Sequence, residues 1–204
     1  MIAIVDYKLG NIFSIKNIFL KLNYNVIVTS DPEIILNSKI VVLPGVGAFD
    51  VAMQNINDLG LAGVLKKVSV DKKFIGICLG FQLLFEQSLE NKKTKGLGII
   101  KGKIFSLKKK NKNKIVPHVG WNITYLRNYN ANKKYVKLLN NKYFYFIHSF
   151  YAEPKNSKDI LTFTKYENLI FCSSILKNNV LGLQFHPEKS GMNGIKLIKN
   201  FLDK

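Results

Sequence analysis

Short runs of apolar residues alternate with segments of helical periodicity through the first half of the chain. The runs stand at residues 2–5, 24–28, 39–43 and 74–77, and the segments between them repeat apolar residues every three or four positions. Strands without a polar face are buried on both sides, as they are in a parallel sheet covered by helices. We therefore predict an α/β fold with an open, mostly parallel sheet flanked by helices.

The pattern changes after about residue 96, where Gly96, Gly98 and Gly102 interrupt the sequence. Short β-like runs at residues 103–107 and 115–116 predict β-hairpins in place of strand–helix–strand units. The further elements predicted are strands at residues 143–147, 160–164, 170–173 and 180–185 and a helix at 194–202. No Pro/Ser-rich linker divides the chain, so we expect a single domain over residues 1–204.

The charge balance raises the question of nucleic-acid binding. The chain has 31 Lys and Arg against 13 Asp and Glu, a formal net charge of +18, and basic proteins bind phosphate backbones. However, 30 of these cations are Lys and only Arg127 is Arg, whereas base edges are most often read by the Arg fork. The densest stretch, residues 101–114, carries seven Lys and is interpreted as a solvated hairpin. We predict no nucleic-acid partner.

Hydropathy and cysteine content favour a cytoplasmic protein. No apolar run reaches the ~18 residues of a membrane-spanning helix, and Asp6 interrupts what would be the core of a signal peptide. Cys78 and Cys172 could form at most one disulfide, which a domain of this size does not need. We expect no membrane partner and a reducing compartment in which a cysteine remains a thiol.

Cys78 lies between two glycines, directly after the strand predicted at residues 74–77. The segment Gly76-Ile77-Cys78-Leu79-Gly80 has the spacing of a nucleophile elbow, in which small flanking residues allow a sharp turn from strand to helix. The amino terminus of the following helix favours a thiolate. A buried structural cysteine is the alternative, and it is the interpretation we give to Cys172.

A base and a carboxylate follow the strand predicted at residues 180–185. They are His186 and Glu188, separated by Pro187, which stiffens the turn. A thiol nucleophile needs a base, and the base needs an orienting group. Because ligands bind at the carboxyl ends of strands in open α/β sheets, we predict that Cys78, His186 and Glu188 form a triad, although a lone His at a strand end is most often structural.

A Gly-x-Gly sequence follows the strand predicted at residues 39–43. Gly45 and Gly47 would let backbone N–H groups turn toward the N–H of Leu79 and form an oxyanion hole. A tight turn also produces this pattern, and the third glycine of a dinucleotide-binding fingerprint is missing. Three His, two Cys and no C-x-x-C provide no ligand spacing for zinc, so we predict neither a metal nor a cofactor.

Seven segments of the chain resemble one known family in sequence and in order. They are DYKLGNIFS (6–14), LPGVGAFDVAM (43–53), GICLGFQLLFEQS (76–88), GLGIIKG (96–102), PHVGWN (117–122), YFIHSFY (145–151) and QFHPEKSG (184–191). The chain resembles the class I, or triad, glutamine amidotransferases over essentially its whole length. PGVGAF, PHVGWN and HSFY are similar to the glutaminase subunits of imidazole glycerol phosphate synthase. Lys8 and Phe81 depart from the family pattern, which commonly has Gly and Met there.

The resemblance implies a flavodoxin-like sheet and a role for each candidate residue. Cys78 would attack the side-chain amide of glutamine, His186 would shuttle protons and Glu188 would orient His186. Gly47 and Leu79 would supply the oxyanion N–H groups. The implied glutamine-binding residues are Gly45, Gln82, Glu90, His148 and Ser149. The residues implied to face a partner are Asn11, His118, Trp121 and Asn122; a core loop is the alternative for the last three.

The leading hypothesis is therefore a glutaminase subunit in a heterodimer. It would hydrolyse glutamine and channel ammonia to a (β/α)8 cyclase subunit, which forms imidazole glycerol phosphate and AICAR in histidine biosynthesis. A paralogous subunit that supplies ammonia to a sugar-modifying enzyme of surface-polysaccharide synthesis is an alternative with the same chemistry. Two further hypotheses are a cysteine hydrolase or chaperone of the same topology and a non-catalytic, Lys-rich binding module.

Overall fold

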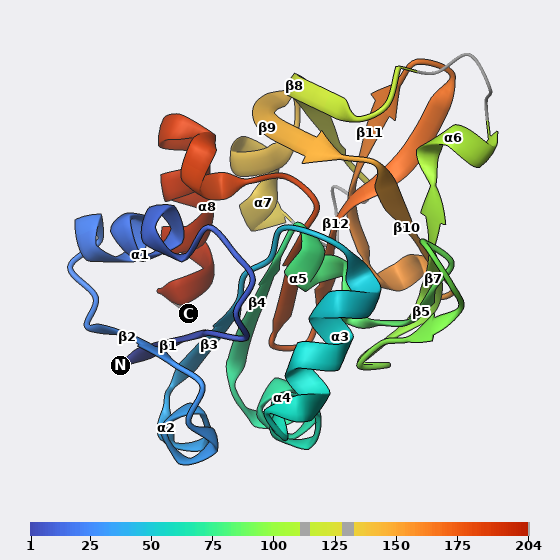
Figure 1. The fold of residues 1–204 in the computed structure, drawn as a ribbon. Helices are drawn as coiled ribbons and strands as arrows, with labels where there is room; N and C mark the ends of the chain where they lie inside the picture. The colour runs from blue at the N-terminus through green and yellow to red at the C-terminus, as the bar shows by residue number, and fades with distance from the viewer. Residues whose placement is uncertain (111–114, 128–132, 204) are drawn as a thin grey trace.

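A parallel sheet of five strands forms the centre of the molecule (Figure 1), which is a computed structural model describing residues 1–110, 115–127 and 133–203. The strand order is β2-β1-β3-β4-β13. These strands are β1 (Ile2–Val5), β2 (Val26–Thr29), β3 (Ile40–Leu43), β4 (Lys73–Ile77) and β13 (Val180–Leu183). This order is that of flavodoxin-like sheets, so the predicted α/β fold class is confirmed.

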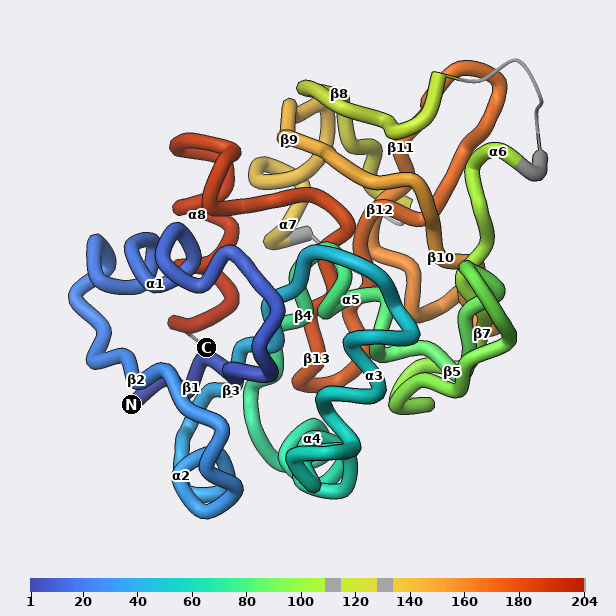
Figure 2. Tube along the Cα trace, in the orientation of Figure 1, coloured from blue at the N-terminus to red at the C-terminus, as the bar shows by residue number. Residues whose placement is uncertain are grey.

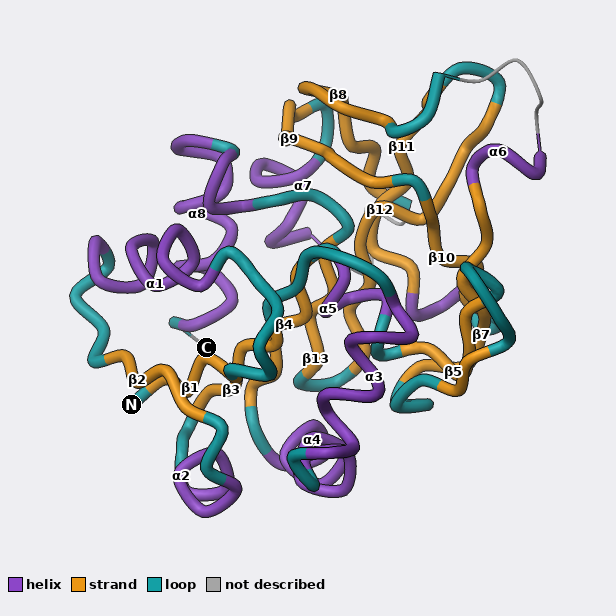
Figure 3. The backbone as a smooth tube through the Cα atoms, viewed as in Figure 1, coloured by secondary structure: helices purple, strands orange, loops and turns teal. Residues whose placement is uncertain are grey.

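Helices cover both faces of the central sheet (Figures 1 and 3). One face packs against α1 (Ile12–Lys21), α7 (Lys133–Leu139) and α8 (Gly191–Leu202), and the other against α2 (Pro32–Asn37), α3 (Phe49–Asp58) and α4 (Leu61–Asp71). Along β1, Ile2 and Ile4 belong to the first core cluster, and Ala3 and Val5 belong to the second. Both faces of the strand are buried, which explains its continuous apolar sequence.

Mostly antiparallel strands extend the sheet beyond β13, and only β5 and β7 pair in parallel among the described strands of this extension. The order continues β12-β10-β7-β5-β6, while β11 pairs with β12 and β8, and β8 pairs with β9. Their bounds are β5 (Phe85–Ser88), β6 (Thr94–Lys95), β7 (Ile100–Ser106), β8 (His118–Leu126), β9 (Lys142–His148), β10 (Phe150–Pro154), β11 (Ile160–Tyr166) and β12 (Leu169–Lys177). The short helices are α5 (Leu79–Gln82), α6 (Leu107–Lys110), η1 (Ser157–Asp159) and η2 (Pro187–Lys189).

Two predictions for the second half were wrong in detail. The lysine-rich stretch at 101–114 is not one hairpin: β7 ends at Ser106 and α6 follows, with residues 111–114 outside the described part of the chain. Residues 115–116 are not a strand, because Pro117 has no N–H to donate and β8 begins after it.

The strand β8 was not predicted because most of its apolar side chains face outward. Val119 and Trp121 are 52% and 55% exposed, whereas His118 and Thr124 are buried. The pairing of β8 with β9 places His118 opposite His148. A strand that turns polar residues inward has the inverse of the pattern from which burial is usually predicted.

The two ends of the described chain lie near each other beside the central sheet (Figure 2). Lys73, which begins β4, donates a hydrogen bond to the carbonyl of Leu202 at the end of α8. Tyr24 donates one to Asp203, at 3.1 Å. The last helix is thus tied to the sheet. Within the described residues, no helix is long and apolar enough to cross a membrane.

Candidate active site

Cys78 stands at a sharp turn between β4 and α5. Its backbone angles are φ 53° and ψ −108°, a strained conformation for a residue with a side chain. Glycines make room for the turn: a Cβ on Gly76 would lie 2.9 Å from the carbonyl oxygen of Gly80, and a Cβ on Gly80 would lie 1.9 Å from that of Leu43. The predicted elbow therefore exists, and it depends on close backbone contact between α5 and the end of β3.

Gly80→Ala is expected to lower the free energy of unfolding by about 3 kcal/mol or more, because the new methyl group overlaps backbone atoms that cannot move away independently. Urea denaturation measures the change. The matched control is Gly63→Ala in α4, where a new Cβ meets nothing within 4 Å and alanine is expected to be neutral or stabilising. Equal stability of the two variants would contradict the packing described for the elbow.

His186 and Glu188 form a buried pair at the end of the strand next to β4. The Nδ1 atom of His186 lies 2.7 Å from Oε1 of Glu188, and the two side chains are 3% and 0% exposed. Burial favours the neutral imidazole, but electrostatic attraction to Cys78 and to Glu188 outweighs it and raises the pKa of His186 to about 10. The site therefore stabilises an imidazolium next to the cysteine.

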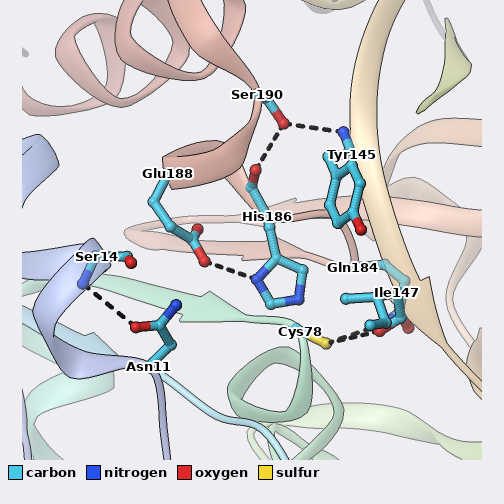
Figure 4. A network of polar contacts seen from close by, with 9 residues as sticks. All are labelled: Asn11, Ser14, Cys78, Tyr145, Ile147, Gln184, His186, Glu188 and Ser190. Carbon is cyan, nitrogen blue, oxygen red and sulfur yellow. Dashed lines mark hydrogen bonds and ion pairs between the residues drawn. The ribbon is translucent and has the colours of Figure 1, made fainter. Parts of the chain in front are cut away.

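Figure 4 shows the imidazole of His186 between the Glu188 carboxylate and Cys78. The Nε2 atom of His186 is buried and has no hydrogen-bond partner within the described residues, and the Cys78 thiol donates to the carbonyl of Ile147 at 3.7 Å. The Ser190 hydroxyl bonds the carbonyl of His186 at 2.6 Å and accepts from the N–H of Tyr145 at 3.0 Å. These contacts fix the backbone of His186 and leave Nε2 available for proton transfer.

A pocket of about 270 Å³ opens beside Cys78, a volume suited to a small polar substrate. Its lining residues are Val46, Gly47, Cys78, Leu79, Gln82, Glu90, Ile147, His148, Ser149 and Phe150. The structure thus brings seven predicted site residues to one cavity. Gly45 is not among the lining residues, but it packs beneath them: a Cβ there would lie 2.5 Å from the Tyr7 hydroxyl and 2.7 Å from Cβ of Leu79.

The two groups predicted to form the oxyanion hole do not both face the cavity freely. The N–H of Leu79 donates to the carbonyl of Gly45 at 3.4 Å. The buried Tyr7 hydroxyl, which the sequence did not single out, holds the same segment through a 2.6 Å bond to the carbonyl of Pro44. Gly47, with φ 108°, has a conformation that favours glycine. In the described conformation, the Leu79 N–H is therefore occupied by the Gly45 carbonyl.

Glu90 is the acidic side chain among the residues that line this pocket. One of its oxygens accepts the N–H of Phe49 at the start of α3, at 2.9 Å, where the helix dipole favours a negative charge. Burial raises the pKa of this carboxyl group, and the backbone hydrogen bond opposes the rise. The carboxylate is positioned to receive a cationic group of a bound molecule.

Gln184 is a site residue that the sequence analysis missed. Its Nε2 lies 3.9 Å from Sγ of Cys78, and its Oε1 accepts from Gln82 at 3.2 Å. Gln82 also donates to the carbonyl of Phe150 at 3.0 Å. Gln184 follows the carboxyl end of β13, two residues before His186, so its position next to a functional strand end was the available signal.

The four residues predicted to face a partner separate into two groups. Trp121 is exposed, and Asn11 is partly exposed and caps α1 by accepting the N–H of Ser14 at 3.4 Å. His118 and Asn122 lie on the other face of β8, because successive side chains of a strand alternate. His118 is only 3% exposed.

Sequence comparison assigns the family. Residues 3–204 match the family model for Glutamine amidotransferase class-I. The chain belongs to the class-I glutamine amidotransferases. It is therefore an enzyme of this family, as its sequence resemblance implied. In the described part of this amidotransferase, no three His, Cys, Asp or Glu side chains are grouped to hold a metal ion.

Several curated relatives of this amidotransferase match it over almost their full length. "Imidazole glycerol phosphate synthase subunit HisH 2" of Methanococcus maripaludis is 47% identical, covering 99% of this chain and 98% of the relative. "Imidazole glycerol phosphate synthase subunit HisH 1" of the same organism is 42% identical, with 100% and 99% covered. "Imidazole glycerol phosphate synthase subunit HisH" of Pyrococcus furiosus is 42% identical, with 98% and 97% covered.

Solved structures share the fold at low sequence identity. A structure titled "Crystal structure of glutamine amidotransferase" has a TM-score of 0.75 at 15% identity, covering 98% of this chain and 97% of that one. "Structure of PurLQS from Thermotoga maritima" has a TM-score of 0.69 at 18% identity, with 99% and 97% covered.

Proposed function

We propose that this amidotransferase is the glutaminase subunit of imidazole glycerol phosphate synthase, acting in the cytoplasm as a single domain over residues 1–204. The observation that carries the proposal is the full-length similarity to relatives named as HisH subunits, at up to 47% identity. The chemistry is supported by the buried His186–Glu188 pair, which lies next to Cys78 at the edge of a substrate-sized pocket.

In the proposed mechanism, Cys78 attacks the side-chain amide carbon of glutamine. His186 takes the thiol proton and donates a proton to the departing ammonia, which leaves a glutamyl thioester on the sulfur. Water then attacks the thioester with His186 as the base, releasing glutamate and the thiol. Glu188 accepts a hydrogen bond from the Nδ1–H of His186 and stabilises the imidazolium that His186 becomes in each step.

Substrate binding is proposed to use the walls of the same pocket. The Glu90 carboxylate receives the α-ammonium group of glutamine, while Gln82 and the segment containing His148 and Ser149 surround the rest of the molecule. The N–H groups of Gly47 and Leu79 receive the oxyanion once the 45–46 peptide has rotated. Since that peptide occupies the Leu79 N–H, we expect low activity until a partner favours the rotated state.

The partner is proposed to be a (β/α)8 cyclase subunit that uses the ammonia to form imidazole glycerol phosphate and AICAR. An apolar ladder supports a docking role for the outer face of β8 and β9. Its cross-strand pairs are Val119 with Ile147, Trp121 with Tyr145 and Ile123 with Tyr143. Asn11 directly precedes α1, and Ser14 of that helix lines a small pocket together with Glu188.

Trp121→Ala is expected to weaken binding of the cyclase about 30-fold, because large aromatic side chains at the centre of an interface contribute most of its affinity. Isothermal titration of the cyclase into the variant measures the effect. Val70→Ala is the matched control, since Val70 is 71% exposed on α4 and does not belong to this ladder. Equal affinities of the two variants for the cyclase would show that Trp121 does not contribute to the interface.

Glutamate release from glutamine tests the proposed function as a whole. The chain is assayed alone, with the cyclase from the same genome, and with that cyclase plus its nucleotide ligand. Strong stimulation by the liganded cyclase supports the proposal. Because a paralogous subunit of polysaccharide synthesis would carry out the same glutaminase chemistry, a second arm pairs the chain with a sugar-modifying amidotransferase partner. Stimulation only in that arm would favour the polysaccharide pathway.

A further inference from the structure

A chain of hydrogen bonds runs from β8 to the glutamine pocket through two buried histidines. Nδ2 of Asn122 lies 3.3 Å from Nε2 of His118, and Nδ1 of His118 lies 3.0 Å from Nε2 of His148. Nδ1 of His148 then lies 2.8 Å from the carbonyl oxygen of Phe150. The two histidines are 3% and 6% exposed, and they face each other across the β8–β9 pairing.

The carbonyl oxygen of Phe150, at the end of the chain of hydrogen bonds, fixes the direction of each bond before it. A carbonyl oxygen only accepts, so Nδ1 of His148 carries a hydrogen and its Nε2 accepts from Nδ1 of His118. Nε2 of His118 then accepts from the Asn122 amide, which also donates to the carbonyl of Lys165 at 2.9 Å. With both imidazoles neutral, each ring nitrogen of His118 and His148 donates or accepts one of these hydrogen bonds.

The surroundings keep these imidazoles neutral. His118 is stacked between the rings of Tyr166 and Phe146, with centroids 4.0 and 4.9 Å away, and Phe171 lies against both histidines. Burial lowers the pKa of His118 to about 4, and burial together with the neighbouring His118 lowers that of His148 to about 3. Neither histidine is therefore a proton carrier at neutral pH.

The chain ends on an atom that organises the pocket. The carbonyl oxygen of Phe150 accepts from both His148 and Gln82, at 2.8 and 3.0 Å. Gln82 is in turn bonded to Gln184, the neighbour of the Cys78 sulfur. Residues 147–150 line the pocket, and the carbonyl of Ile147 accepts from the Cys78 thiol.

We propose that His118, with Asn122 behind it, is a positioning residue that holds the 147–150 segment in its glutamine-binding conformation through His148. This inference rests on the proposed glutaminase function. It places His118 inside the protein and gives it a structural link to the substrate, whereas the exposed face of β8 carries Trp121. His118 touches neither the thiol nor the pocket, so its effect on catalysis is exerted through His148.

Two variants of His118 separate hydrogen bonding from packing. His118→Phe keeps a ring in the aromatic stack and loses the donor to His148. His118→Asn loses the ring, but its amide nitrogen occupies the place of Nδ1 and keeps the donor. If the hydrogen bond positions the segment, the Phe variant is the weaker of the two in glutamine recognition, although the Asn variant loses more packing.

The readout is alkylation of Cys78 in the full chain by two reagents. A diazoketone analogue of glutamine must occupy the pocket before it reacts, whereas iodoacetamide needs only the thiol. We expect the half-saturating concentration of the analogue to rise about tenfold in His118→Phe and by no more than about threefold in His118→Asn. Iodoacetamide is expected to react with both variants at about the wild-type rate.

The same experiment gives the results that would overturn the inference. It fails if the Asn variant binds the analogue as poorly as the Phe variant, if neither differs from wild type, or if the iodoacetamide rate falls in parallel. Wild-type protein that, with the liganded cyclase present, still reacts with iodoacetamide but not with the analogue would instead contradict the proposed function. The chain has three His, so nitrogen NMR of the imidazoles checks independently that His118 and His148 both carry the hydrogen on Nδ1.

Discussion

Cys78→Ala is expected to reduce glutamine hydrolysis by about 10⁴-fold or more, with little change in stability. The thiol is the only nucleophile at the turn between β4 and α5 in the described structure, and its removal leaves no group to form the thioester. Glutamate release is measured with the liganded cyclase present, so that the wild-type rate is high enough to resolve the loss. Thermal denaturation checks that the variant is folded.

Cys172→Ala is the matched control for the loss of a thiol. Cys172 is buried in β12, its thiol lies 3.4 Å from the carbonyl of Ser174, and burial raises its pKa. We expect this variant to retain activity and to lose about 1–2 kcal/mol of stability. Full activity in Cys78→Ala, or loss of activity confined to Cys172→Ala, would show that the nucleophile has been misassigned.

The central sheet could be predicted because strands buried on both faces have continuous apolar runs in the sequence. The strand at Ile2–Val5 has apolar residues for both core clusters, and residues 40–43 and 74–77 repeat the pattern. The turn at Cys78 could also be predicted, since only small residues at 76 and 80 permit the close contact seen there. Local pattern and tertiary packing agree in these elements.

The second half could not be predicted to the same extent, because several of its strands place polar side chains toward the site and apolar side chains on the outer surface. In β8, the inward positions carry His118 and Asn122, and the outward position at 121 carries Trp. Leu126 is the one buried apolar side chain of this strand, which is too little to show from the sequence which face of β8 points inward. Only the polar partners at the end of β9 and in β11 explain why these side chains turn inward.

For the site, residue types could be predicted but not conformations. Cys78, His186 and Glu188 were identified from their strand-end positions, which the fold brings to one edge of the sheet. The bond from the Leu79 N–H to the carbonyl of Gly45 could not be inferred, because a glycine-rich segment permits several peptide orientations. The contact of Gln184 with Gln82 likewise depends on elements far apart in the chain.

Glu188→Gln is expected to lower kcat/KM for glutamine about 10³-fold while the protein stays folded. The amide keeps the size of the carboxylate but removes the charge that stabilises the imidazolium, and it can present a donor to Nδ1 and force the wrong tautomer. Glu33→Gln, on the exposed first turn of α2, is the control and should leave the rate unchanged. A similar loss in both variants would show that charge in general, and not the pair with His186, is responsible.

The pH profile of the same variant separates orientation from electrostatics. The charges of Cys78 and Glu188 raise the pKa of His186 to about 10 against the effect of burial. Because the amide that replaces the Glu188 carboxylate is neutral, the imidazolium loses stabilisation and its pKa falls. The protonated form that donates to ammonia is then lost at lower pH, so the alkaline limb of kcat/KM moves toward neutrality. An alkaline limb at the wild-type pH, with the rate still reduced, would mean that Glu188 acts by orienting His186 and not by stabilising its charge.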